Sequence, residues 1–252
     1  MAKHGKPLGI DIGGSGIKGA PVDLDKGDFA EKRLKILTPR PATPDAVAAV
    51  VDQIVDHFAE QTGDSPIGVT VPAVVIRGTV LSAANIDPAW LNTDAEALIQ
   101  EHTGRSATVL NDADAAGLAE MYYGAAKGVS GVVILTTLGT GIGSALISDG
   151  KLVPNTELGH LEIDGYDAER RAASSVKENE GLSWEEYVER LQVYYNTIEK
   201  LFSPDLIVVG GGISKDADDF LPKLKLRAAI VPAQLRNKAG IIGAARLAAD
   251  LA

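Results

Sequence analysis

The 252-residue chain contains no cysteine, which excludes disulfide bonds and thiolate zinc sites. Its 4 histidines, His4, His57, His102 and His160, do not have the spacing of metal ligands. No apolar run approaches the roughly eighteen residues that a membrane helix needs. The apolar run after the N-terminal MAKHGKP is too short for a signal peptide. These absences predict a cytoplasmic protein that does not bind membranes.

Positive charge is also scarce, because 24 Lys and Arg residues stand against 34 Asp and Glu residues and give a net charge of −10. A general nucleic-acid binder needs a basic face to displace counterions, so we expect no nucleic-acid partner. No Gly-x-Ser-x-Gly elbow is present, which disfavours acyl transfer. The hydrophobic content of 45% is that of a globular protein, and the length suits one large domain or two moderate ones.

Glycine, in contrast, is concentrated at turns. The stretch Leu8–Ala20, LGIDIGGSGIKGA, predicts a strand, a tight turn and a second strand. Glycines let backbone N–H groups approach a ligand, and successive N–H groups at a turn form a concave anion site. Asp11, just before the turn, has the carboxylate that can hold Mg²⁺ through water. Taken alone, the motif also fits an ordinary glycine hairpin.

The same design returns later in the chain. The segment VVILTT predicts a strand that Leu138-Gly139-Thr140-Gly141-Ile142-Gly143 joins to a second strand ending at Ile147. A third glycine turn follows the strand Leu206–Val209, and we expect a helix to begin near Ser214. A glycine turn that leads into a helix N-terminus is a further candidate phosphate contact.

The remaining pattern predicts α/β structure. The strand Ala107–Leu110 is followed directly by Asn111-Asp112 and an alanine-rich helix, a junction where open sheets place ligand chemistry or where Asn and Asp only cap the helix. A helix is predicted from Pro44 to Gly63, followed by a strand at Ile67–Val71 and a strand of the same sheet at Thr79–Ala83. The next helix has a Thr93–Glu96 capping box and closes at Gly104, and a last helix is expected at about Ala239–Leu251. A further helix is capped by Ser183 and Glu186, and its apolar face is Trp184, Val188, Leu191, Tyr195, Ile198 and Phe202.

Glycine turns combined with carboxylates suit phosphoryl transfer. That reaction needs backbone donors and Mg²⁺ to stabilise the charge of the phosphoryl group, and a carboxylate to accept a hydroxyl proton. Asp112 is the carboxylate that we expect to be the base.

Five motifs in this order and spacing resemble the sugar kinases of the repressor–open-reading-frame–kinase (ROK) family: GIDIGGSGIKGA, LNDADAAGLAE, LTTLGTGIGSALI, ELGHLE and LIVVGGGIS. The resemblance runs from about Leu8 to Ala245. A narrower likeness, in KGAPVDLD, LTPRPATP, NTELGHLEIDG and ERRAASSVKE, is to the members that phosphorylate glucose from inorganic polyphosphate.

The resemblance implies a two-domain fold related to actin and hexokinase (ribonuclease H-like), with the active site in the cleft between domains. The small domain would be residues 1–111 with the helix at about 239–252, and the large domain residues 112–238. The family implies phosphorylation of glucose, and in some cases mannose, at the 6-hydroxyl with Mg²⁺. Its relatives are usually homodimers.

The resemblance also implies site residues, each at a matching position of this sequence. Asp112 matches the catalytic base. The positions that match sugar contacts are Asn85, Asn111, Asp112, Glu157, His160 and Glu169. The positions that match phosphate contacts are Gly13, Gly14, Ser15 and Lys18, then Thr137, Gly139, Thr140 and Gly141, and finally Gly211 and Gly212, where the family holds adenosine or distal phosphates. From the glycine turn itself we also expect Asp11 and Gly16 at the phosphate site.

One departure is clear. Most of the family has a cysteine-rich zinc loop before the second sugar-binding glutamate, whereas this chain has only LEIDGYDAERRAAS. We therefore expect no zinc, and the missing loop weakens the assignment of Glu169.

The donor is less defined than the acceptor. Polyphosphate would need a track of cations, for which Lys18, Lys151, Lys215, Arg236 and Lys238 are candidates, and ATP is a second donor. The alternatives are a strictly ATP-dependent hexose or amino-sugar kinase of the same fold, a sugar-responsive repressor, which would need a DNA-binding module ahead of Leu8, and an ATPase of the actin class.

Overall fold

The computed structural model describes residues 5–83 and 86–252, which form two compact units that we describe separately. The first unit runs to Ala119 and also takes in Lys238–Ala252, and the second is Glu120–Asn237. The division falls inside helix α4 (Asp112–Tyr123), after Ala119 and eight residues beyond the boundary at Asn111 that we expected. Asp112 therefore belongs to the first unit.

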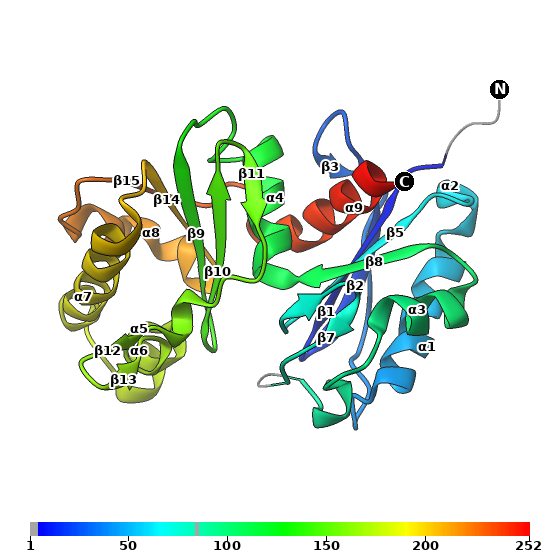
Figure 1. Ribbon diagram of the computed structural model, residues 1–252, viewed down its shortest axis with the longest axis horizontal. Helices are drawn as coiled ribbons and strands as arrows, with labels where there is room; N and C mark the ends of the chain where they lie inside the picture. Colours follow the sequence, from blue (N-terminus) through cyan, green and yellow to red (C-terminus); the bar gives the residue numbers. More distant parts are fainter. Residues whose placement is uncertain (1–4, 84–85) are drawn as a thin grey trace. The chain divides into compact units, whose positions relative to one another are not determined.

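The first unit contains a six-stranded sheet (Figure 1). Its order is β3-β2-β1-β5-β8, with β4 paired to β2; β1 and β2 are antiparallel, and β5 and β8 continue the sheet in parallel with β1. The strands are β1 (Leu8–Gly13), β2 (Gly16–Asp23), β3 (Asp28–Phe29), β4 (Leu34–Ile36), β5 (Ile67–Val71) and β8 (Ala107–Asn111).

The expected strand Thr79–Ala83 is wrong in length and in sheet. Only β7 (Thr79–Val80) forms, and it pairs with β6 (Val75–Ile76) in a separate two-stranded ribbon. A chain that turns back on itself at Arg77 and Gly78, both with positive φ, satisfies its backbone groups locally and does not reach the main sheet.

The helices of the first unit are α1 (Pro44–His57), α2 (Ala59–Thr62), the 3₁₀ turn η1 (Pro88–Trp90), α3 (Ala95–Thr103) and α9 (Ala239–Leu251). The expected Thr93–Glu96 capping box is wrong. Asp94 caps α3 by accepting a hydrogen bond from the N–H of Ala97, while Glu96 accepts one from Val109 on β8. The closing residue, Gly104, is confirmed and lies in the left-handed region.

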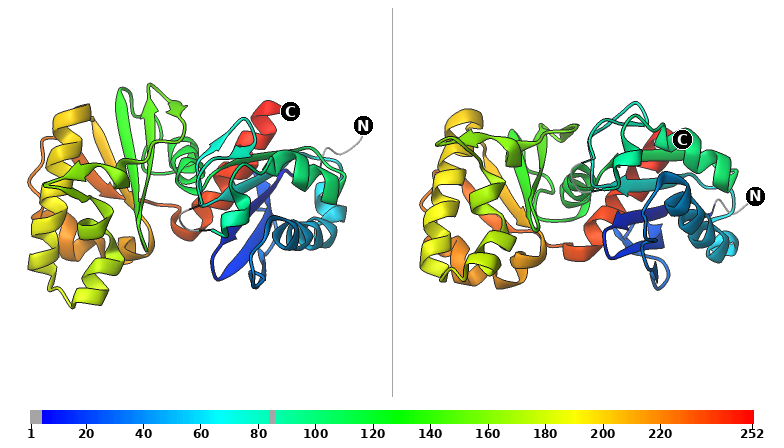
Figure 2. Two further views of the ribbon diagram at one scale, coloured as in Figure 1. Left: turned by 60° about the horizontal axis from the view of Figure 1, so that its bottom comes forward. Right: turned by 90° about the horizontal axis from the view of Figure 1, so that it is seen from below.

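The two faces of the first sheet are covered by different helices. A Cβ on Gly9 or Gly68 would lie 1.9 Å from a carbonyl oxygen of α9, so the α9 backbone lies flush against β1 and β5 (Figure 2). A Cβ on Gly19 would instead meet Ile54 of α1, on the opposite face. Ile54 belongs to a core of buried aliphatic side chains that also includes Trp90.

The second unit has a five-stranded sheet of order β11-β10-β9-β14-β15, in which β9–β10 and β10–β11 are antiparallel and β9, β14 and β15 are parallel. Its strands are β9 (Val132–Leu138), β10 (Ile142–Ser148), β11 (Lys151–Val153), β14 (Leu206–Gly210) and β15 (Ala229–Pro232), with a hairpin of β12 (Glu162–Ile163) and β13 (Tyr166–Asp167) outside the sheet. Its helices and 3₁₀ turns are η2 (Leu158–His160), α5 (Glu169–Ala172), α6 (Ser174–Glu180), α7 (Trp184–Phe202), η3 (Gly212–Asp216), α8 (Ala217–Phe220), η4 (Leu221–Lys223) and, at the boundary, η5 (Arg236–Lys238).

Helix α7 supplies much of the core of the second unit. The capping box of Ser183 and Glu186 at its start is confirmed, with bonds in both directions. Its apolar face includes two tyrosines that the sequence pattern did not single out, Tyr187 and Tyr194, both fully buried. Tyr195, also buried, shares a 2.8 Å hydrogen bond with Thr136 of β9, which ties α7 to the sheet. Among the described helices, none has both the length and the apolar composition that crossing a membrane requires.

The contact between α9 and the first sheet gives a direct prediction. We expect Gly68→Ala to lower the free energy of unfolding by about 1–3 kcal/mol, because the added methyl group collides with backbone that cannot rotate away. Urea denaturation measures this change. Gly14→Ala is the control, since a Cβ there meets nothing within 4 Å, and an equal loss in both variants would contradict the explanation.

Candidate functional site

The first glycine turn joins β1 to β2 and carries a charged pair at its base. Asp11 and Lys18 are directly opposite each other in the hairpin, and Lys18 Nζ lies 3.2 Å from Asp11 Oδ2. The other carboxylate oxygen accepts a 3.0 Å hydrogen bond from the hydroxyl of Thr70 on β5. The start of α9 is also close, because a Cβ on Gly240 would lie 3.6 Å from Asp11 Oδ1.

The tip of this turn is open. Gly14 and Ser15 are exposed, and a Cβ on Gly14 would meet nothing within 4 Å. Behind the turn, the hydroxyl of Thr38 donates a 2.5 Å hydrogen bond to the carbonyl of Gly13. An open turn with its carbonyl held from behind leaves room for an anion at its N–H groups.

The junction of β8 and α4 holds the predicted base. Asn111 is buried, and its side-chain oxygen accepts hydrogen bonds from the N–H groups of Ala113 (2.8 Å) and Asp114 (3.2 Å). Its amide nitrogen donates to the carbonyl of Ala73. Asp112 is half-buried on the first turn of α4, where the helix dipole stabilises its negative charge. Asn111 thus caps the helix on which Asp112 sits, and its second amide hydrogen is the donor that a sugar hydroxyl could use.

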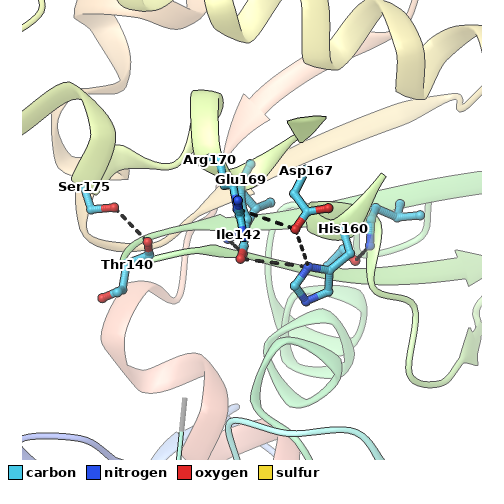
Figure 3. Close-up of polar contacts among 9 residues, drawn as sticks. Thr140, Ile142, His160, Asp167, Glu169, Arg170 and Ser175 are labelled. Carbon is cyan, nitrogen blue, oxygen red and sulfur yellow. Dashed lines mark hydrogen bonds and ion pairs between the residues drawn. The ribbon is translucent and has the colours of Figure 1, made fainter. Parts of the chain in front are cut away.

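The second glycine turn joins β9 to β10 in the other unit. It resembles the first in design, with the Gly139 N–H bonded across the turn to the carbonyl of Gly141 at 2.9 Å. At the start of α6, the hydroxyl of Ser174 donates to the carbonyl of Gly139 at 3.1 Å. The hydroxyl of Ser175 donates to the carbonyl of Thr140 at 2.7 Å (Figure 3). Neither serine was among the predicted site residues.

The third glycine turn lies at the same end of the second sheet. Thr137 of β9 pairs with Gly210 of β14, and a Cβ on Gly211, whose φ is +84°, would lie 2.2 Å from the carbonyl oxygen of Leu138. The helix expected to begin near Ser214 is short and starts as a 3₁₀ helix, η3, which leads into the four-residue α8. The hydroxyl of Ser214 donates to the Gly211 carbonyl at 2.8 Å and so shapes the turn locally.

The polar residues expected to contact sugar in the second unit gather beside the second glycine turn. Glu169 Oε2 accepts a 3.2 Å hydrogen bond from the N–H of Ile142, and Glu169 Oε1 lies 3.9 Å from Nδ1 of His160 (Figure 3). The His160 nitrogen also lies 3.9 Å from Asp167. Burial raises the pKa of Glu157, the nearby charge of Glu169 raises it further, and His160 opposes this rise.

The β12–β13 hairpin lies between His160 and Glu169 in the chain and brings the two side chains near each other. Strands β12 and β13 turn at Asp164 and Gly165, both with positive φ, and the N–H of Ala168 donates to the carbonyl of Leu161 at the base of the hairpin. The segment that we expected to leave Glu169 poorly placed therefore closes on itself through backbone hydrogen bonds.

The predicted residues thus fall into two sets. Asp11, Lys18, Asn111, Asp112 and the first glycine turn belong to the first unit, and Glu157, His160, Glu169 and the other two glycine turns belong to the second. Asn85 lies outside the described residues. That the two sets bind one sugar and one phosphate donor stays a prediction.

The two α/β units each contain a glycine hairpin. The first also has Asp112 on a helix that Asn111 caps, and the second has the cluster of Glu157, His160 and Glu169. This combination is typical of a sugar kinase. Residues 7–173 match the model of the ROK family, and the chain belongs to that family. The expected two-domain α/β fold class is therefore confirmed, and the active site in the cleft between the domains stays a prediction.

Relatives narrow the comparison. The chain is 51% identical to a polyphosphate glucokinase of Mycobacterium tuberculosis over 244 residues, 96% of this chain and 90% of that protein. It is 52% identical over 239 residues to a polyphosphate glucokinase of Mycobacterium leprae, 94% of this chain and 73% of that one. The crystal structure of an inorganic polyphosphate/ATP-glucomannokinase from Arthrobacter sp. strain KM matches with a TM-score of 0.93 and 56% identity, over 98% of this chain and all of that one.

The raised pKa of Glu157 predicts a pH-dependent stability. At pH values between the ordinary pKa and the raised one, folded Glu157 keeps a proton that the unfolded chain has released. The free energy of unfolding therefore falls as the pH rises through that window. We expect Glu157→Gln to be more stable than the parent protein by a few degrees in Tm at pH 8, and the difference to vanish near pH 4. Glu178→Gln, at an exposed position, is the control. A difference that is the same at both pH values would contradict this cause.

Proposed function

We propose that the chain transfers the terminal phosphoryl group of inorganic polyphosphate or ATP to the 6-hydroxyl of glucose, with Asp112 as general base. The observation that carries the proposal is the position of Asp112, on the capped first turn of α4, in a chain so similar to polyphosphate glucokinases.

The chemical step needs little covalent help from the protein. Asp112 accepts the proton of the 6-hydroxyl while the oxygen attacks the terminal phosphorus, and the bond between that phosphorus and its bridging oxygen breaks. A positioned base contributes about 10²–10⁴-fold to the rate. The two hydrogen bonds from α4 to Asn111 hold the start of the helix, and with it the carboxylate, in place.

Sugar selection rests on groups that can pair with hydroxyls. Glu157, His160 and Glu169 offer acceptors and a donor that a ring of hydroxyls can satisfy, and a sugar with a misplaced hydroxyl leaves one of them unpaired. Mannose is proposed as a second substrate, since the similar Arthrobacter protein is a glucomannokinase.

Donor binding is proposed at the glycine turns, which contact phosphate through backbone N–H groups and need no base. Among the candidate track cations, Lys18 is paired with Asp11 at 3.2 Å. Lys238 donates to both carboxylate oxygens of Asp28, at 2.7 and 3.0 Å. Lys151 and Arg236 are exposed, and Lys215, also exposed, lies 4.0 Å from Asp216. Lys238 therefore stabilises the fold of the first unit, and the exposed cations are the better candidates for a polyphosphate chain.

The donor set around Asp11 fits Mg²⁺. The described residues contain no cluster of three or more acidic or histidine side chains that could hold a metal. Mg²⁺, however, commonly uses one carboxylate together with waters and substrate phosphates, and Asp11 supplies that carboxylate next to the first turn. When bound, Mg²⁺ neutralises charge on the phosphate oxygens. The homodimer that the family suggests stays a prediction.

Asp112→Asn tests the base. We expect kcat to fall by about 10²–10⁴-fold while Tm changes little, because the amide keeps the shape of the side chain but accepts no proton. Asp219→Asn, at an exposed position on α8, is the matched control and should keep full activity. A kcat within tenfold of the parent would show that another group takes the proton.

The donor is tested by measuring glucose 6-phosphate formation with Mg²⁺ and either ATP or polyphosphate. We expect product from both donors. Product from ATP alone would instead identify a strictly ATP-dependent kinase, and hydrolysis of ATP without glucose would favour an ATPase of the actin class. Mannose and amino sugars, assayed in the same way, define the acceptor.

A further inference from the structure

We propose that Ser174 and Ser175 are positioning residues that set the second glycine turn for phosphate binding, an inference that rests on the proposed function. The start of α6 makes three hydrogen bonds to this turn. The two hydroxyls donate to the carbonyls of Gly139 and Thr140, and the backbone N–H of Ser175 donates to the Gly139 carbonyl at 3.1 Å.

The direction of these bonds determines where the N–H groups of the turn point. In a trans peptide the C=O and the following N–H point in opposite directions. Because the Gly139 carbonyl is directed at α6, the Thr140 N–H points away from it. The Thr140 carbonyl is directed at α6 as well, so the Gly141 N–H also points away. Two successive N–H groups with one direction form a nest that binds an anion.

The remaining N–H groups of the turn have other partners. Gly139 donates across the turn to Gly141, and Ile142 donates to the carboxylate of Glu169 (Figure 3). The carboxylate of Glu169 is also packed against Gly141, because a Cβ on Gly141 would lie only 2.4 Å from Glu169 Oε2. The turn is thus held by α6 on one side and by Glu169 at its far end, which leaves Thr140 and Gly141 as the donors directed at phosphate.

This arrangement suits a donor that has no base to recognise. Backbone N–H groups read only the charge and shape of a phosphate, so the same pair serves ATP and polyphosphate. We call the three hydrogen bonds from Ser174 and Ser175 to this turn the brace. Loss of the brace should weaken the binding of both phosphate donors equally and leave glucose binding unchanged. Substitution of a residue with only a structural role would instead lower the stability of the protein without changing the KM for the donor more than the KM for glucose.

Steady-state kinetics of Ser175→Ala, Ser175→Thr and Ser175→Val test the brace. We expect the KM for ATP and for polyphosphate to rise about three- to tenfold in the alanine and valine variants, as the loss of one hydrogen bond predicts. The KM for glucose should stay within about twofold. Threonine keeps the hydroxyl in a side chain shaped like valine, so Ser175→Thr should retain a donor KM near that of the parent.

Ser183→Ala is the matched control. It removes a hydroxyl that caps α7 in the same unit, so it should lower Tm and leave both KM values unchanged. The proposal is overturned if Ser175→Ala leaves the donor KM unchanged, if glucose KM rises as much as donor KM, if only one donor is affected, or if threonine and valine behave alike.

Binding of inorganic tripolyphosphate, measured by calorimetry without sugar, separates this inference from the proposed function. Weaker binding by Ser175→Ala than by Ser175→Thr supports the brace, and equal binding overturns it. Absence of glucose phosphorylation by the parent protein would overturn the proposed function alone.

Discussion

The first unit depends on the backbone contact between α9 and the glycines of β1 and β5. With no side chain at Gly9 or Gly68, the carbonyls of Ile241 and Ala244 approach the sheet more closely than any Cβ would allow. This contact joins the end of the chain to its beginning. It also places the start of α9 beside Asp11, so one packing constraint serves both the core and the candidate phosphate site.

Hydroxyl groups of nearby side chains fix the conformation of the three glycine turns. Thr38, Ser175 and Ser214 each donate to a carbonyl of a different glycine turn. A glycine-rich turn has many accessible conformations, and a hydrogen bond to its carbonyl selects among them. Phosphate binding by backbone N–H groups needs such pre-organisation, because the N–H direction follows from the peptide plane.

The β12–β13 hairpin shapes the polar cluster of the second unit. The β12–β13 hairpin uses backbone hydrogen bonds and two positive-φ residues to bring Glu169 within 3.9 Å of His160. The result couples Glu169 to the second glycine turn through the Ile142 N–H. Burial beside this cluster raises the pKa of Glu157, and the nearby charge of Glu169 acts in the same direction.

The sequence by itself determined the elements whose signals are local. The glycine hairpins, the capping box of α7 and the strand–helix junction at Asn111-Asp112 follow from turn chemistry and periodicity, and the motif order indicated the family. Only the tertiary structure decided the rest. Asp94, not Thr93, caps α3, and Glu96 bonds to β8. The ribbon at Thr79 pairs away from the main sheet, and the hydrogen bonds of Ser174 and Ser175 join segments 35 residues apart. Such contacts depend on folding in three dimensions, which periodicity along the chain does not encode.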